Sequence, residues 1–278
     1  MPGPTGRRIR SLPLADTRSY GHRGPVVFVL HGGPGAPGYM EPVARELGDG
    51  FTAIEVLQRT GADGGLSVER HVSDLRDIVA TYGQGEPALI VGHSWGAMLA
   101  MAYGAAHPET LGGLMLIGSG TFDTASRQRL AELRQERLGE SGRAAMARLK
   151  TSSLIVTDRM KRSAGLLFKT DSHDLAEIGT PASAFDVLGH DASWDDMMRL
   201  QSDGTYPAAY SGIACPVLML HGEQDPHPGH MIRDSLTPHV PQLAYVELDR
   251  CGHYPWLERH ARDRFYQAVR GWLAQMAP

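Results

Sequence analysis

The stretch ALIVGHSWGAMLAMAYGAA, residues 88–106, decides the fold of this chain. Its first four residues, Ala88–Val91, form the continuous apolar run that is typical of a parallel strand buried on both faces. The turn GHSWG follows at once, and Trp95–Ala106 continues as a helix of small residues that can pack closely on a sheet. Strand, sharp G-x-S-x-G turn and helix together form the context of a nucleophile elbow. Ser94 is therefore the predicted nucleophile.

Five further apolar runs predict more strands of the same sheet. Three are continuous, and two mix apolar with polar positions, as at the margin of a sheet. The continuous runs are Val26–Leu30, Leu114–Ile117 and Val217–Leu220, and the mixed runs are Thr52–Leu57 and Leu243–Leu248. Helical patterns occupy Ser67–Tyr82 and Pro255–Met276. Strands that alternate with helices predict an α/β fold, with a mostly parallel central sheet flanked by helices.

The segment Phe122–Ser211 interrupts this alternation, because it contains no good buried strand. Ser126–Lys150 is helical by pattern, and the later pieces look like short helices broken by Gly and Pro. A structureless loop of this length would be exceptional in a compact domain. We therefore expect a core domain made of residues 1–120 and 212–278, with residues 121–211 inserted as a helical cap, or lid.

Charge is divided unevenly within the predicted cap. Residues 127–162 contain ten Arg and Lys against four acids, whereas residues 171–203 contain eight acids against one Arg. The simpler interpretation is that two solvated helix faces attract each other. The alternative is that one of the two faces lines the entrance for a substrate.

The chain as a whole has the composition of an ordinary globular protein. It has 278 residues, of which 42% are hydrophobic and 21% charged, and a net charge of −4. A mildly acidic chain has no bulk attraction for nucleic acid or anionic lipid. Neither an apolar run long enough for a membrane span nor the apolar stretch of a signal peptide is visible. We expect a cytoplasmic enzyme that acts on a small molecule or a short peptide, with neither nucleic acid nor membrane as a partner.

A serine nucleophile needs a base, because its hydroxyl is hardly nucleophilic at neutral pH. The run VLMLHG leads to Asp225, and LAYVEL leads to His253, so both residues follow predicted strands. The carboxyl ends of parallel strands meet at one edge of a sheet, where open α/β sheets place their sites. We predict that Asp225 orients His253 and that His253 takes the proton from Ser94. Asp123, which follows another strand, is the alternative acid.

Other histidines and the two cysteines are predicted to have structural roles. A histidine at a strand end is expected to make a structural hydrogen bond, and His227 and His230 are expected to point into the helix that begins beside them. The strand-end histidines are His31, His93 and His221. Cys215 and Cys251 are predicted to lie too far apart for a disulfide. Cys251 precedes His253 by two residues and could be a nucleophile, although a small loop residue is the preferred interpretation.

The run HGGPG, residues 31–35, comes directly after a predicted strand. Backbone N–H groups in such a glycine-rich turn can approach an oxyanion, and we assign this role to Gly33, with the N–H of Trp95 as the second donor. A phosphate-binding loop is disfavoured, because no G-x-x-x-x-G-K-[ST] occurs and Pro34 removes a donor. No metal-binding spacing is apparent, and the predicted mechanism needs no cofactor.

Together these motifs resemble the proline iminopeptidase-like branch of the α/β-hydrolase superfamily. The motifs are HGGPG, GHSWG, the acid after HGEQ and the histidine in CGHYP, and the similarity covers Val26–Gly120 and Ile213–Trp272. That branch usually carries Asp-Gln-Arg-Gly-x-Gly-x-Ser, where this chain has Leu57–Gly64. Its members hold the amine of the substrate with acidic cap residues, for which Glu177 and Asp186 are the candidates here.

We therefore expect a serine hydrolase that cleaves a small ester or amide through an acyl-enzyme on Ser94. A proline iminopeptidase-like aminopeptidase and a carboxylesterase or thioesterase both fit these motifs. A lyase, an acyltransferase or a haloperoxidase-like enzyme on the same scaffold is the alternative class, because a fold does not determine a function. A binding module without activity is disfavoured, because all three triad positions are filled.

Overall fold

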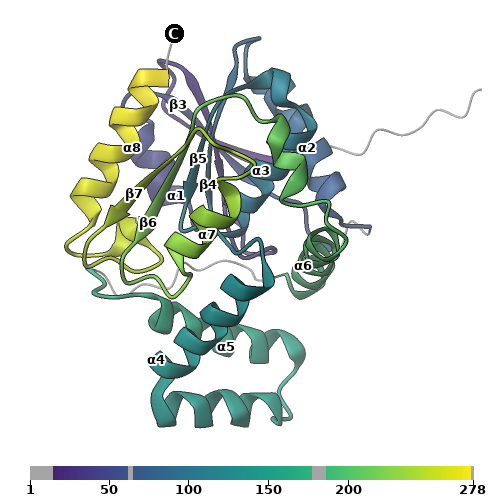
Figure 1. Cartoon of the computed structure of the whole chain (residues 1–278), viewed down its shortest axis with the longest axis vertical. Helices are drawn as coiled ribbons and strands as arrows, with labels where there is room; N and C mark the ends of the chain where they lie inside the picture. Colours follow the sequence, from purple (N-terminus) through teal and green to yellow (C-terminus); the bar gives the residue numbers. More distant parts are fainter. Residues whose placement is uncertain (1–14, 62–64, 177–185, 277–278) are drawn as a thin grey trace, which may run out of the picture.

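One seven-stranded sheet forms the centre of the molecule (Figure 1). The computed structural model describes residues 15–61, 65–176 and 186–276. The strand order is β1-β3-β2-β4-β5-β6-β7, and every pairing is parallel except that of β1 with β3. The strands are β1 (Asp16–Tyr20), β2 (Val26–Leu30), β3 (Thr52–Leu57), β4 (Ala88–His93), β5 (Leu111–Ile117), β6 (Val217–Gly222) and β7 (Leu243–Leu248).

The predicted α/β class with a mostly parallel sheet is confirmed, and six of the seven strands coincide with runs that the sequence indicated. Of the two mixed runs, β7 is an edge strand, and β3 is separated from the other edge by β1 alone. The sequence analysis missed β1. The sequence of β1, DTRSY, contains no run of apolar residues that would predict a strand. This fits its position at the edge of the sheet, where none of its residues is buried.

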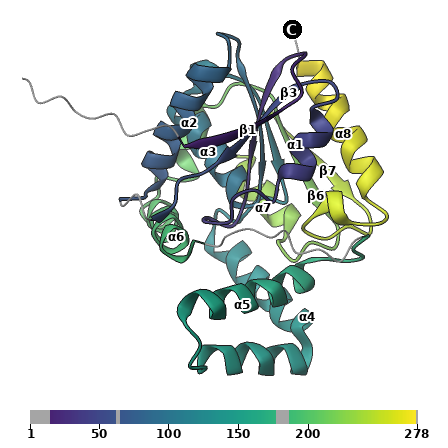
Figure 2. The same cartoon turned by 180° about the vertical axis from the view of Figure 1, so that it is seen from behind.

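Helices cover both faces of the sheet. Helices α1 (Glu41–Leu47) and α8 (Arg262–Met276) lie on one face, and α2 (Val68–Tyr82), α3 (Trp95–Ala106) and α7 (Gly229–Leu236) lie on the other (Figures 1 and 2). Successive residues of β2 point to opposite faces. Val27 therefore packs with α1 and α8, whereas Phe28 packs with α2 and α3.

The C-terminal helix begins later than the sequence suggested. Pro255–Leu257 forms a separate short 3-10 turn, η4, and α8 starts only at Arg262. The backbone at the end of this turn pairs with the chain that follows α5: Glu258 forms an antiparallel bridge with Leu175, and the carbonyl of Leu257 accepts a hydrogen bond from the amide of Ala176. The prediction of one helix from Pro255 was therefore wrong, because tertiary hydrogen bonds hold its first turn apart.

Residues 121–211 contain three long helices and no strand among the positions that the structure describes. These are α4 (Thr124–Lys150), α5 (Val156–Asp171) and α6 (Val187–Ser202). The backbone of α4 is not helical at Gly139, with φ 60° and ψ −173°, so this element consists of two helical segments joined at a kink. Helices α4 and α5 pack against each other beyond the carboxyl edge of the sheet (Figures 1 and 2). Their lengths correct the expectation of short helices after residue 150. No helix in the described ranges is long and apolar enough to cross a membrane.

Candidate active site

Ser94 occupies a strained turn between β4 and α3. Its backbone has φ 54° and ψ −115°, in a region that residues with side chains rarely adopt. A Cβ on Gly92 would lie 2.3 Å from the carbonyl oxygen of Gly96, and a Cβ on Gly96 would lie 2.5 Å from that of Leu30. Only glycine fits at these two positions, and the serine is thereby held at the carboxyl edge of the sheet.

Asp225 and His253 meet at the same edge. Asp225 follows β6 and His253 follows β7, and both side chains are buried. Nδ1 of His253 lies 2.7 Å from Oδ2 of Asp225. Burial by itself would raise the pKa of Asp225, but His253 and the other histidines around the carboxylate hold it well below its usual value. The carboxylate is thus charged, as a group that orients and stabilises an imidazolium must be.

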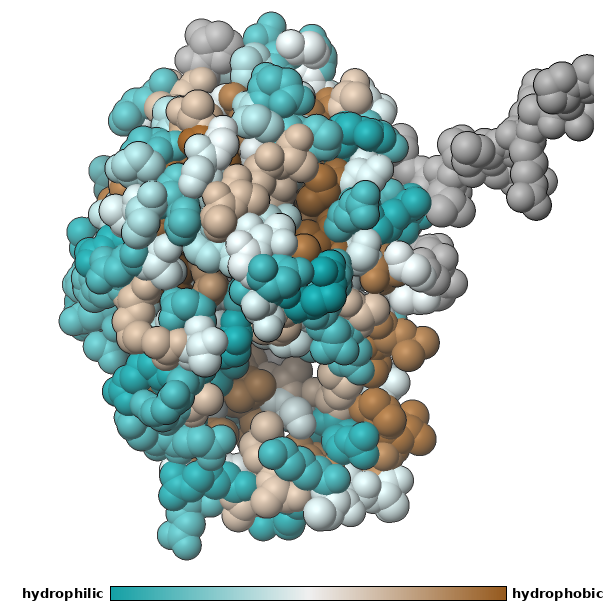
Figure 3. Space-filling view, turned by 45° about the vertical axis from the view of Figure 1, so that its right-hand side comes forward, coloured by the Kyte–Doolittle hydropathy of each residue, from teal (hydrophilic) through white to brown (hydrophobic). Residues whose placement is uncertain are grey.

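Ser94 and His253 line one cavity of about 830 Å³. The loops at the carboxyl edge of the sheet form one wall, and residues of α4, α5 and α6 form the other. Figure 3 shows that the surface is hollowed at the level between the sheet and these helices, with hydrophobic side chains inside the hollow. A ligand that fills this cavity would lie against the serine.

The HGGPG loop lies directly beside the serine. A Cβ on Gly32 would be 2.7 Å from Cβ of Ser94, and Gly33, with φ 43°, lines the cavity. Trp95 is the first residue of α3, so its N–H has no carbonyl partner within the helix. Both positions that were predicted to supply oxyanion donors therefore border the cavity.

Gln58 joins this loop to the elbow. Its Nε2 donates to the carbonyl of His31 at 2.9 Å, and its Oε1 accepts from Nε1 of Trp95 at 2.8 Å. Arg59 forms a buried ion pair with Asp74 at 2.6 Å. Gln58 and Arg59 are the two residues of the segment Leu57–Gly64 that match the iminopeptidase pattern. Residues 62–64 of this segment lie outside the described ranges. Gln58 thus links the start of the HGGPG loop to the side chain of Trp95.

His227 is the residue that the sequence analysis misjudged. Its side chain does not point into its own helix. Its backbone N–H donates a hydrogen bond to Oδ1 of Asp225, and its Nδ1 lies 2.8 Å from the same oxygen. Its ring stacks on that of His253, with centroids 4.1 Å apart. Burial, reinforced by His253, lowers the pKa of His227 to about 4, so it is neutral at pH 7. Its spacing of two residues from the acid was the available signal.

Gly118, at the end of β5, is a second residue that the sequence analysis missed. Its φ is 48°, and a Cβ there would lie 3.1 Å from Nδ1 of His253 and 3.3 Å from Oδ2 of Asp225. The position therefore allows the acid and the histidine to approach each other. A glycine directly after a buried strand, opposite the strand of the acid, was the available signal.

The alternative candidates have other partners. Asp123 caps α4, where it accepts the amide of Ser126 at 2.8 Å, and Asp225 is the acid that contacts His253. Cys251 is free and buried, and its pKa is raised by burial and by Glu258. A buried neutral thiol is a poor nucleophile.

The histidines at strand ends have the structural partners expected of them. His31 Nδ1 lies 3.0 Å from the carbonyl oxygen of Gly32. His93 Nε2 lies 2.9 Å from the carbonyl oxygen of His253, and His221 Nε2 lies 2.8 Å from the carbonyl oxygen of His227. His230, in contrast, lies on the surface beside Glu247.

Asp225, His227 and His253 also form a cluster that could hold a metal ion, with ligand atoms within 4.8 Å of one another. The spacing of the histidines had not indicated this cluster. Nδ1 of each histidine already contacts the carboxylate of Asp225. The donor set therefore fits a hydrogen-bonded array, in which the acid is the shared acceptor.

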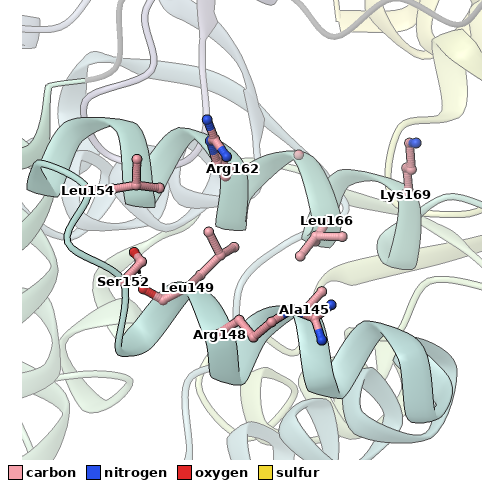
Figure 4. A pocket seen from close by; sticks show the side chains of 9 residues that line it. Ala145, Arg148, Leu149, Ser152, Leu154, Arg162, Leu166 and Lys169 are labelled. Atoms are coloured by element: carbon pink, nitrogen blue, oxygen red, sulfur yellow. Dashed lines mark hydrogen bonds between the residues drawn. The ribbon is translucent and has the colours of Figure 1, made fainter.

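The basic segment is divided between two faces of the molecule. Arg127 and Arg134 line the cavity beside Ser94. Arg148 and Arg162, in contrast, line a separate hollow between α4 and α5, into which Leu149 points (Figure 4). The cations counted in the sequence thus belong to two different surfaces.

The acidic residues contribute little to the cavity. Of the acids in the described segments, only Asp171 lines it, and Arg134 binds Asp171 through two hydrogen bonds. Asp186 accepts the backbone N–H of Gly61 instead, and Glu177 lies outside the described residues. The two charged segments therefore meet chiefly through this one ion pair.

The chain belongs to the α/β-hydrolase family, because a model described as "Alpha/beta hydrolase family" matches residues 26–268. Members of this family are generally hydrolytic enzymes. No curated protein matches the sequence.

Solved structures with the same fold include enzymes of several activities. Est816, described as an N-acyl homoserine lactone degrading enzyme, is 22% identical with a TM-score of 0.61, over 92% of this chain and 96% of its own. A thermophilic esterase from Thermogutta terrifontis is 20% identical with a TM-score of 0.64, over 95% and 94%. Proline iminopeptidase from Mycobacterium smegmatis is 19% identical with a TM-score of 0.65, over 96% and 98%. At such identities the likeness concerns the fold.

Proposed function

We propose that this protein is a carboxylic ester hydrolase with a Ser94–His253–Asp225 triad. The observation that carries the proposal is the strained elbow serine, which shares a cavity with the histidine of a buried Asp–His pair. His253 takes the proton of Ser94 as the hydroxyl attacks the ester carbonyl, and Asp225 stabilises the resulting imidazolium. The N–H groups of Gly33 and Trp95 bind the oxyanion.

The second half of the reaction releases the acid. His253 gives its proton to the leaving alcohol, an acyl-enzyme remains on Ser94, and water activated by the same histidine hydrolyses it. Residues 121–211 act as a cap in this proposal, because α4, α5 and α6 supply the wall of the cavity that faces the serine. The cap would exclude bulk water and select the acyl chain.

An ester is favoured over an N-terminal proline peptide because of the charges in the cavity. A peptide substrate would bring a protonated amine, which needs a carboxylate without a cation of its own. Asp171 is the one acid among the described lining residues, and the bidentate contact with Arg134 already neutralises it. Solved structures of the same fold include an esterase and a lactone-degrading enzyme as well as a proline iminopeptidase, so the preference rests on the charges in the cavity.

A labelling experiment combined with two assays tests this proposal. A fluorophosphonate probe should label the wild-type protein and should not label Ser94→Ala. The wild type should hydrolyse p-nitrophenyl hexanoate and should leave proline p-nitroanilide intact. Turnover of the prolyl substrate alone would make the protein an aminopeptidase, and an active protein that never labels would belong to the non-hydrolytic class.

A further inference from the structure

The cavity beside Ser94 carries an excess of positive charge. The Arg, Lys, Asp and Glu side chains that line it, among the described residues, are Arg127, Arg134, Lys161 and Asp171. His227 adds no charge, because its pKa is lowered to about 4. Three cations therefore face one carboxylate, and that carboxylate is bound to Arg134.

Of the three cations, Arg127 is half-buried and its hydrogen bonding is incomplete, whereas Lys161 is exposed to solvent. Its Nη2 donates to Oε1 of Gln201, which is a neutral amide. Its Nε is buried and has no hydrogen-bond partner within the described part of the chain. Among the described residues, Arg127 forms no ion pair with a carboxylate, whereas Arg134 on the same helical segment forms one. A buried charged donor without an acceptor is costly, so the site is suited to an external anion.

The acids nearest along α6 do not compensate this charge. Asp196 and Asp203 both pair with Arg199, at 2.8 and 3.0 Å. Oδ2 of Asp196 also accepts the backbone N–H of Val68 at 2.8 Å. The carboxylates of these two acids therefore bind partners on α6 and at the start of α2. The residue of α6 that contacts the Arg127 guanidinium is Gln201, a neutral amide.

Apolar side chains lie beside Arg127 in the same wall. Arg127, Leu130, Arg134 and Leu138 recur at helical spacing and so form one face of α4, which turns toward the serine. Met98 and Trp194 line the same cavity. A ligand that satisfies this wall has an apolar chain and an anionic end, and a planar guanidinium matches the two oxygens of a carboxylate.

We propose that Arg127 is a specificity residue that binds a carboxylate of the substrate, so that the preferred substrates are monoesters of dicarboxylic acids. The scissile ester would lie at Ser94, the methylene chain along Leu130 and Met98, and the free carboxylate at the Arg127 guanidinium. This inference rests on the proposed ester hydrolysis but goes beyond it, because the triad alone sets no preference for a charged acyl chain.

Matched substrates provide the test. Mono-p-nitrophenyl adipate and p-nitrophenyl hexanoate have acyl chains of equal length. The adipate chain ends in a carboxylate, whereas the hexanoate chain ends in a methyl group. We expect the wild type to have a higher kcat/KM for the adipate ester. Arg127→Gln should lower the adipate-to-hexanoate ratio of kcat/KM about tenfold, mainly through KM, since a lost charged hydrogen bond is typically worth that factor. Arg127→Lys should recover part of the ratio.

Arg148→Gln is the matched control, because it removes the same charge from the part of α4 beyond Gly139, which lines the other hollow (Figure 4). Its ratio should equal that of the wild type. A wild-type preference for hexanoate, or an equal ratio in wild type and Arg127→Gln, would overturn the inference while leaving ester hydrolysis intact.

A binding measurement separates this inference from the proposed function. Adipate itself should bind the wild type, by titration calorimetry, about tenfold more tightly than it binds Arg127→Gln. This result would support the anion site even if neither ester were hydrolysed, in which case the proposed function alone would fail. Equal affinity of the two proteins for adipate would overturn the anion site.

Discussion

Replacing Gly118 by alanine tests whether the contact between Asp225 and His253 depends on the strand next to them. The added Cβ would lie 3.1 Å from Nδ1 of His253 and 3.3 Å from Oδ2 of Asp225, so it would press on both atoms of the 2.7 Å contact. Relief requires a shift of a few tenths of an ångström in a packed site. The positive φ of 48° adds about 1–2 kcal/mol of backbone strain.

We expect Gly118→Ala to lower kcat/KM for p-nitrophenyl hexanoate by about tenfold to a hundredfold. The estimate follows because misplacing a catalytic group by about 1 Å can cost about a hundredfold in rate. Stability should fall by about 1–2 kcal/mol, measured by urea unfolding. The fold should persist, since a loss of this size is smaller than the stability of a typical domain.

Gly85→Ala separates the two effects. Gly85 also has a positive φ, of 83°, but nothing lies within 4 Å of a Cβ built on it. This variant should lose a similar amount of stability and keep the activity of the wild type. The reasoning fails if Gly118→Ala stays within twofold of wild-type kcat/KM, or if Gly85→Ala loses as much activity as Gly118→Ala does.

Three further predictions concern the acid, the base and the response to pH. His253→Ala should lower kcat by several orders of magnitude in the ester assay, and near-normal turnover would remove it from the mechanism. Asp225→Asn should be similarly severe, whereas Asp123→Asn should be mild in kcat because that residue caps a helix; the reverse pattern would exchange the two acids. The free energy of unfolding should decrease as the pH falls from about 6.5 to 4. In this pH window a histidine binds a proton in the unfolded chain, but a buried histidine of the folded chain does not. Each such histidine can lower the free energy of unfolding by up to about 3 kcal/mol. Urea titrations between pH 7 and 4.5 measure this decrease, and a constant stability would contradict it. The histidines whose pKa burial lowers to about 4 are His31, His71 and His227.

The placement of the serine could be predicted from sequence because its causes are local. A buried strand, a turn that only glycine can make and a helix of small residues follow one another without a gap in residues 88–106. The acid and the histidine could be located because each follows a parallel strand, and the carboxyl ends of such strands share an edge. Their contact of 2.7 Å depends on the parallel pairing of β6 with β7, which brings the two loops together.

Other features of the site depend on packing between distant segments. Whether His227 turns toward Asp225 is set by the loop after β6, and no periodic pattern encodes the conformation of that loop. Strand β1 was invisible to the sequence because an exposed edge strand buries no apolar face.

The charges of residues 121–211 show most clearly where sequence reasoning ends. Counting along the chain gave one basic and one acidic segment, but it could not assign a face to any of these charges. The packing of α4 places Arg127 beside the serine and Arg148 in a separate hollow, while Arg134 binds Asp171, the one acid among the described residues that line the cavity. The sequence therefore determined the fold and the predicted nucleophile, because short-range sterics and strand order specify them. The charge that a substrate would meet was decided by tertiary structure, because the packing of each helical segment on either side of Gly139 sets which of its side chains face the cavity.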